Sequence, residues 1–129
     1  MRIEAYFRQF QDTVDSSPIV RSARVTYDKR SSYEGYIRGE LDFVDESRLH
    51  VREFVSVEES IDRLTYAYQY MNAAQELIFR YDNTGHHRKL DLATYPHHKH
   101  DGSESHVVES SGPKLEQTLQ EIERLIFSR

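Results

Sequence analysis

The chain has 129 residues, a length that favours one domain with a single modest core. Apolar residues make up 37% of the chain and charged residues 30%, but nine tyrosines and six phenylalanines argue against disorder, and the lack of cysteine excludes disulfides, iron–sulfur clusters and thiolate nucleophiles. The net charge of −5 excludes a protein that coats nucleic acid through bulk electrostatics, so any nucleic-acid binding needs a local basic site.

The first predicted element is a helix over residues 1–15. Its apolar residues recur at helical spacing and would form one buried stripe: Ile3, Tyr6, Phe7, Phe10 and Val14. Ser16, Ser17 and Pro18 are residues that end a helix, so we expect the chain to leave the helix there.

Residues 19–83 are predicted to form an antiparallel sheet, because polar and apolar residues alternate in five successive segments. The apolar positions of these segments are Ala23, Val25 and Tyr27; Ile37, Gly39, Leu41 and Phe43; Leu49, Val51, Val55 and Val57; Leu64, Tyr66, Tyr68 and Tyr70; and Leu77, Phe79 and Tyr81. The short connections between the segments favour a five-stranded meander.

After Asn83 the alternation ends, and residues 84–112 are expected to form a long loop rich in histidine. Pro113 suits the first turn of a helix predicted over residues 113–128, with Ser111 or Gly112 as its cap. Its buried stripe would be Leu115, Leu119, Ile122 and Ile126. The fold class is therefore α+β, one domain over residues 1–129, in which the N-terminal and C-terminal helices pack on one face of a five-stranded antiparallel meander sheet.

Six of the seven histidines lie within 21 residues, namely His86, His87, His97, His98, His100 and His106. Histidine transfers protons near neutral pH, binds metals or changes its charge with pH, and composition does not choose among these roles. In an extended segment His98 and His100 would share one face while His97 points to the other. The alternative is a solvated polar loop whose histidines have separate structural roles.

A metal site is one interpretation of this cluster. His98 and His100 could bind a divalent metal such as zinc together with His86 or His87, completed by Asp82 or Glu53. The spacing matches no diagnostic zinc motif. We therefore expect no cofactor, and the alternative is a metal site whose ligands are His87, His98, His100 and Asp82.

The residues beside the histidines give the segment a local positive charge. Residues 80–100 carry a net charge of +2, and the rest of the chain carries −7. Arg80 and Asp82 share one strand face, where they form either an exposed ion pair or a site in which Arg80 holds an anion and Asp82 orients an imidazole. The charges favour a compact phosphate site and not a broad basic face.

Two features of the predicted strands have both a structural and a functional reading. Glu53 has the parity of the core-facing residues, so either a bulge turns it outward or it is a buried carboxylate that is paired, protonated or functional. Tyr66, Tyr68 and Tyr70 form a ladder that either packs beneath a helix or offers a platform for unstacked bases.

Several motifs resemble those of the TumE-like family of prokaryotic toxin–antitoxin proteins, and the likeness spans most of the chain. The most specific are Leu77-Ile-Phe-Arg-Tyr-Asp-Asn83 followed by His86-His87, and Tyr95-Pro-His-His-Lys-His100; Val51-Arg-Glu-Phe54 and Tyr66-Ala-Tyr-Gln-Tyr70 precede them. The resemblance implies a small toxin that is encoded beside a helix-turn-helix antitoxin and neutralised by it. RNA cleavage is the activity that the resemblance implies.

Side-chain chemistry then predicts a metal-independent endoribonuclease with RNA as its substrate. His98 and His100 are the expected proton-transfer residues, His87 and Glu53 are further acid–base candidates, and Arg80 and Lys99 would stabilise charge on phosphorus. The other expected binding residues are Asp82, His86, His97 and Tyr68.

Two alternatives stay open: a metal-dependent phosphodiesterase that uses the same histidines, and a non-catalytic interaction module. The apolar runs are short and the first residues lack the core of a signal peptide, so we expect a cytoplasmic protein without membrane association. The sequence leaves a homodimer open.

Overall fold

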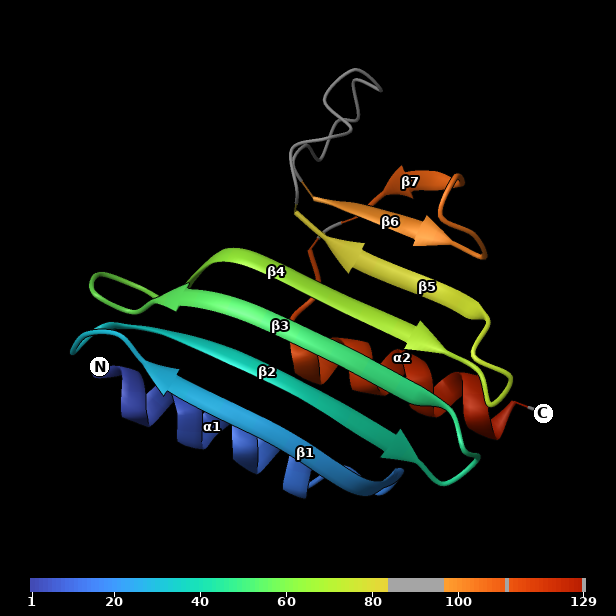
Figure 1. Ribbon diagram of the computed structural model, residues 1–129, viewed down its shortest axis with the longest axis horizontal. Helices are drawn as coiled ribbons and strands as arrows, with labels where there is room; N and C mark the ends of the chain where they lie inside the picture. The colour runs from blue at the N-terminus through green and yellow to red at the C-terminus, as the bar shows by residue number, and fades with distance from the viewer. Residues whose placement is uncertain (84–96, 111, 129) are drawn as a thin grey trace.

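The computed structural model describes residues 1–83, 97–110 and 112–128. The chain forms two layers, an antiparallel sheet and a pair of helices on one of its faces (Figure 1). This confirms the α+β class and the meander, since the strands follow one another in sequence order. The expected number of strands is wrong, because the sheet has seven strands instead of five.

The first five strands are those that the alternation predicted: β1 (Val20–Lys29), β2 (Glu34–Phe43), β3 (Arg48–Ser56), β4 (Asp62–Met71) and β5 (Leu77–Asp82). The two additional strands, β6 (His98–Asp101) and β7 (Val107–Glu109), lie in the segment that was expected to be a loop. They are short, and the buried positions of β6 are histidines, so the apolar alternation that marks a strand is missing there.

Helix α1 (Ile3–Asp15) buries Ile3, Phe7, Phe10 and Val14, and its last turn closes with a hydrogen bond from the Ser16 N–H to the Asp12 carbonyl. Helix α2 (Leu115–Phe127) begins later than predicted. Its N-cap is Lys114, whose backbone N–H donates to Gln117 Oε1 at 2.8 Å. Pro113 precedes the helix instead of occupying its first turn.

The strand register divides the sheet into two faces that are used below. Residues directly opposite each other on neighbouring strands share a face. The helix face is the one that α1 and α2 cover, and it carries the apolar ladder of Val51, Tyr68 and Tyr81. The open face is the opposite one, and it carries Arg52, Ala67 and Asp82, which are also aligned across strands.

A bulge in β4 changes which residues reach the helix face. The pairing with β3 passes from Phe54–Thr65 to Val55–Arg63, so it skips Leu64. Leu64, which the alternation placed with the tyrosines, is 41% exposed, and Arg63 takes the helix-face position instead. The long arginine side chain thus enters the layer between the sheet and the helices.

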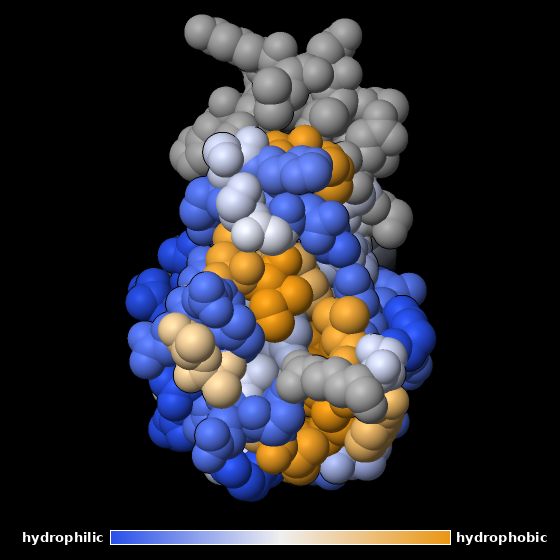
Figure 2. Space-filling model, turned by 90° about the vertical axis from the view of Figure 1, so that its right-hand side faces the viewer, coloured by the Kyte–Doolittle hydropathy of each residue, from blue (hydrophilic) through white to orange (hydrophobic). Residues whose placement is uncertain are grey.

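Hydrophobic side chains are framed by hydrophilic ones on the end of the molecule at which α2 ends (Figure 2). Leu125 and Phe127, in the last turns of α2, are among the exposed large hydrophobic residues. Neither helix in the described part of the chain has the length and apolar character that crossing a membrane requires.

Candidate functional site

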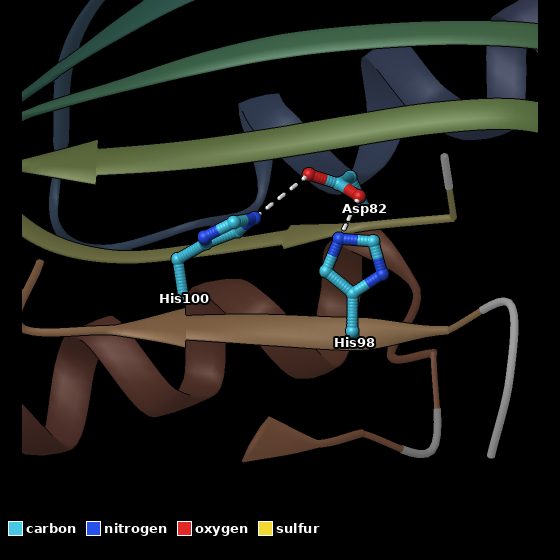
Figure 3. Close-up of side chains that lie close together, drawn as sticks. All are labelled: Asp82, His98 and His100. Carbon is cyan, nitrogen blue, oxygen red and sulfur yellow. Dashed lines mark ion pairs between the residues drawn. The ribbon is translucent and has the colours of Figure 1, made fainter. Parts of the chain in front are cut away.

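The pairing of β5 with β6 brings three polar side chains together on the open face. Asp82 lies opposite His98 and Arg80 lies opposite His100 across the two strands. The side chains of Asp82, His98 and His100 point toward one another (Figure 3), and we call them the His–Asp cluster. All three residues are at least 98% buried, which is unusual for ionisable groups and requires that they be paired.

Asp82 stands between the two imidazoles. His98 Nε2 lies 2.5 Å from Asp82 Oδ1, and His100 Nε2 lies 3.5 Å from Asp82 Oδ2. The imidazole rings meet edge to face with their centroids 5.1 Å apart. One carboxylate therefore contacts both histidines, and it can stabilise positive charge on either ring.

Arg80 contacts the His–Asp cluster from β5, where it lies two residues before Asp82 and on the same face. Its Nε donates to Asp82 Oδ2 at 3.0 Å, its Nη2 lies 3.0 Å from His100 Nε2, and its Nη1 donates to Glu104 Oε1 at 2.8 Å. The Arg80 side chain is 23% exposed and that of Glu104 is 60% exposed. The guanidinium thus joins the buried cluster to the surface.

The hydrogen bonds define the tautomer of His100. Its Nδ1 lies 2.8 Å from the carbonyl oxygen of Glu104, which can only accept, so Nδ1 carries the proton. In the neutral ring Nε2 then has the lone pair and accepts from Arg80 Nη2. For His98, Nε2 is the nitrogen that faces the Asp82 carboxylate, which favours a proton on that atom.

The His–Asp cluster is also a set of metal-ligand types. One ligand atom from each of Asp82, His98 and His100 lies within 4.8 Å of the other two. These are three of the four ligands that the metal interpretation named, and the fourth, His87, lies outside the described residues. The Arg80 guanidinium bonds to Asp82 and His100, and its positive charge opposes a metal cation at the same atoms.

The open face next to the cluster is hollowed and basic. A depression of about 770 Å³ is lined by four arginines, Arg24, Arg38, Arg52 and Arg80, and by two acidic residues, Glu40 and Asp82. The charge count along the sequence finds one basic segment, residues 80–100, and does not bring these arginines together. The missing signal is the cross-strand register, which aligns residues that are far apart in the sequence.

Lys99 does not join the cluster. It lies between His98 and His100 on β6, so its side chain points to the helix face. There Nζ donates to Glu121 Oε2 of α2 at 3.1 Å and lies 5.0 Å from the centroid of the Tyr81 ring. The structure thus separates Lys99 from Arg80, although both were expected to bind the same phosphate.

Glu53 and Tyr68 form a second polar group, which lies inside the helix face. Glu53 is 2% exposed, and its two carboxylate oxygens accept hydrogen bonds from Tyr6 and Tyr68. Burial raises the pKa of Glu53 above its ordinary value, although the two phenols and Arg63 act in the opposite direction. Glu53 is thus a paired core carboxylate and no bulge turns it outward, while Tyr68 is fully buried and offers no platform to a base.

His97 belongs to the same layer and anchors the segment before α2. Its Nδ1 lies 2.9 Å from Tyr66 Oη, and burial lowers the pKa of His97, with Arg63 contributing. Arg63 Nη2 donates to the Gly112 carbonyl at 2.6 Å.

His86 and His87 lie outside the described residues. Of the predicted site residues, the structure therefore brings together four: Arg80, Asp82, His98 and His100.

The fold and the site together define the class of protein: a small α+β protein with a buried His–Asp cluster on the open face of its sheet. The model of the family described as Toxin TumE matches residues 9–126, which is nearly the whole chain. The chain therefore belongs to the TumE toxin family. Membership in this family supports a role as the toxin of a toxin–antitoxin system and implies an antitoxin as partner. No curated protein and no solved structure matches the chain.

Proposed function

We propose that this toxin is a metal-independent endoribonuclease whose catalytic residues are His98 and His100. The observation that carries the proposal is the convergence of two buried imidazoles on one carboxylate, with an arginine at the surface side of the cluster. Cleavage of RNA through its own 2′-hydroxyl needs a base, an acid and a cation near phosphorus, and these four residues supply all three.

The phosphate of the substrate would first meet Arg80, because its guanidinium is the most exposed part of the site. The ion pair of Arg80 with the exposed Glu104 can be exchanged for one with a phosphate. As the guanidinium turns to the phosphate it leaves His100 Nε2, which then has its lone pair free to take a proton.

In the proposed reaction His100 Nε2 takes the proton of the ribose 2′-hydroxyl while the 2′ oxygen attacks phosphorus. The bond from phosphorus to the 5′ oxygen breaks, and protonated His98 gives its proton to that oxygen. The products are a 2′,3′-cyclic phosphate and a 5′-hydroxyl. Asp82 stabilises the protonated state of His98, and Arg80 stabilises the negative charge that develops on the phosphate.

Replacement of either histidine tests this proposal. His98→Ala and His100→Ala should each lower the cleavage rate of a synthetic RNA by about 10²- to 10⁴-fold. His106→Ala, which removes an exposed histidine of the β6–β7 turn, is the matched control and should cleave normally. Because both cluster histidines are buried, His98→Gln and His100→Gln should be measured as well, with circular dichroism to establish folding. Folded variants that cleave at the wild-type rate would rule the proposal out.

A metal-dependent phosphodiesterase is the second candidate, favoured by the close approach of three ligand-type side chains in the His–Asp cluster. A metal held by Asp82, His98 and His100 would activate a water molecule for attack on phosphorus. The two candidates differ in their products and in their response to chelation. A 2′,3′-cyclic phosphate formed in the presence of a chelator supports the first, and activity that is lost on chelation and restored by zinc supports the second.

A further inference from the structure

The middle of the open face carries an arginine pair that lacks a partner for its charge. Arg38 of β2 and Arg52 of β3 lie directly opposite each other, and both are exposed. Among the residues that the structure describes, neither has a carboxylate within ion-pair distance. Like charges in directly opposed positions destabilise a sheet, so this pair has a cost that an anion bound between the two side chains would remove.

The other arginines of this face differ in that respect. Arg24 forms ion pairs with Glu40 and Asp42, and Arg48 does the same. The hydrogen bond from Arg48, with a further contribution from Arg24, lowers the pKa of Asp42 to about 2. These charges are already balanced within the protein, and those of Arg38 and Arg52 are not.

An aromatic pair lies two residues further along the same two strands, and therefore on the same face. Tyr36 and Phe54 are opposite each other, and their rings are stacked with centroids 4.5 Å apart. Both residues are partly exposed, and Arg30 Cζ lies 5.0 Å from the centroid of the Tyr36 ring. Partly exposed aromatic rings beside arginines are the surface on which proteins stack unpaired bases.

The arginine pair connects the aromatic pair to the His–Asp cluster. Arg38 and Arg52 line the large depression together with Arg80 and Asp82, and they also line a smaller one of about 160 Å³ with Tyr36 and Phe54. Across the strands, Arg52 is followed by Ala67 and then by Asp82. Two strand spacings are about 10 Å, and the small side chain of Ala67 leaves that interval open.

We propose that the open face binds single-stranded RNA, with a phosphate held between Arg38 and Arg52 and an unpaired base stacked on the Tyr36–Phe54 pair. The strand then continues over Ala67 to Arg80. This inference rests on the proposed function only for what happens at the His–Asp cluster, because binding alone requires no catalysis. A duplex hides the faces of its bases, so the aromatic pair selects single strands.

The test measures binding separately from cleavage. The probe is a fluorescent single-stranded RNA with 2′-O-methyl riboses, which removes the attacking hydroxyl, in a buffer that contains a chelator. The double variant Arg38→Gln, Arg52→Gln should weaken binding by about tenfold or more. Tyr36→Ala and Phe54→Ala should each weaken it by about fivefold or more, the loss expected for one stacked base.

The matched control is the double variant Arg8→Gln, Arg124→Gln, which removes two exposed arginines from the helices and changes the net charge equally. It should bind the probe as the wild type does. A control that loses as much affinity as the open-face variant would overturn the inference, and so would unchanged binding by that variant. Aromatic variants with wild-type affinity would also overturn it, because they would mean that the arginines bind an anion without base stacking, as they would bind an acidic peptide. Equal binding of a duplex would overturn it too, because a duplex offers no unpaired base to the rings.

The two proposals fail in different ways. If the histidine variants cleave normally while the open-face variants lose the probe, only the catalytic assignment is wrong. If the open-face variants bind and cleave as the wild type does while the histidine variants are inactive, only the binding surface is wrong.

Discussion

At the scale of single residues, Glu53 shows how a buried carboxylate makes stability depend on pH. Burial raises its pKa in the folded protein above the ordinary value of 4.5. Below that ordinary value both folded and unfolded chains hold the proton, so Glu53 imposes no penalty. As the pH rises through this range toward the folded pKa, the unfolded chain releases its proton first, and the folded state loses stability.

Glu53→Gln should therefore reduce the loss of stability as the pH rises above about 4.5. An amide can still accept from one of Tyr6 and Tyr68 and donate to the other, so the packing is kept. Urea unfolding over a series of pH values measures the effect. Glu59→Gln, at an exposed turn position, is the control and should leave the profile as it is. An unchanged profile for Glu53→Gln would contradict the assignment.

At the scale of elements, the turn between β6 and β7 supplies a partner for Arg80. Glu104 binds Arg80 Nη1 at 2.8 Å and is itself 60% exposed, so under the proposed function a phosphate would have to replace it. Glu104→Gln should therefore tighten binding of the 2′-O-methyl probe by up to about fivefold, the range of an exposed ion pair. Glu116→Gln, on an exposed position of α2, should not change it. Weaker binding by Glu104→Gln would show that Glu104 positions Arg80 for the substrate.

The connection from β7 to α2 depends on a glycine that cannot carry a side chain. Gly112 has φ +70°, and a Cβ there would lie 2.7 Å from His97 Nδ1 and 3.0 Å from Tyr66 Oη. An alanine in the left-handed conformation costs roughly 1–2 kcal/mol. Gly112→Ala should lower the free energy of unfolding by more than this, because the added Cβ also collides with His97 and Tyr66. Gly102 has φ +81° with nothing within 4 Å of such a Cβ, so Gly102→Ala measures the backbone cost alone. Equal losses in thermal unfolding would show that His97 and Tyr66 move aside.

The elements also differ in how well the sequence predicts them. Helix α1 and strands β1–β5 follow from apolar periodicity, because most of their buried and half-buried positions are apolar. Strand β6 buries His98 and His100 instead, and hydropathy assigns such residues to solvent. The alternation of His97, His98 and His100 nevertheless predicted correctly which of them share a face. The sequence around Leu64 gives no sign of the bulge, so apolar periodicity does not predict that Arg63 reaches the helix face.

At the scale of the whole molecule, the sheet register creates a basic surface on an acidic protein. The net charge is −5, yet Arg38, Arg52 and Arg80 come from three strands to one depression. Local composition could identify the histidine segment and its charge, because those residues are neighbours in sequence. It could not show that Arg38 and Arg52 lie opposite each other, because their pairing is a property of the folded sheet.

This distribution of charge predicts how RNA binding responds to salt. The logarithm of the association constant for a single strand falls with the logarithm of salt concentration with a slope of about −0.7 for each phosphate neutralised. Because the net charge repels RNA, the slope should reflect the arginines of the open face alone. The double variant Arg38→Gln, Arg52→Gln should make the slope shallower by about 0.7, the value for their one shared phosphate, whereas Arg8→Gln, Arg124→Gln on the exposed sides of the helices should leave it unchanged. Fluorescence titrations of the 2′-O-methyl probe over a range of salt concentrations measure both slopes. Equal changes for the two variants would mean that overall charge, and not a phosphate held at Arg38, determines binding.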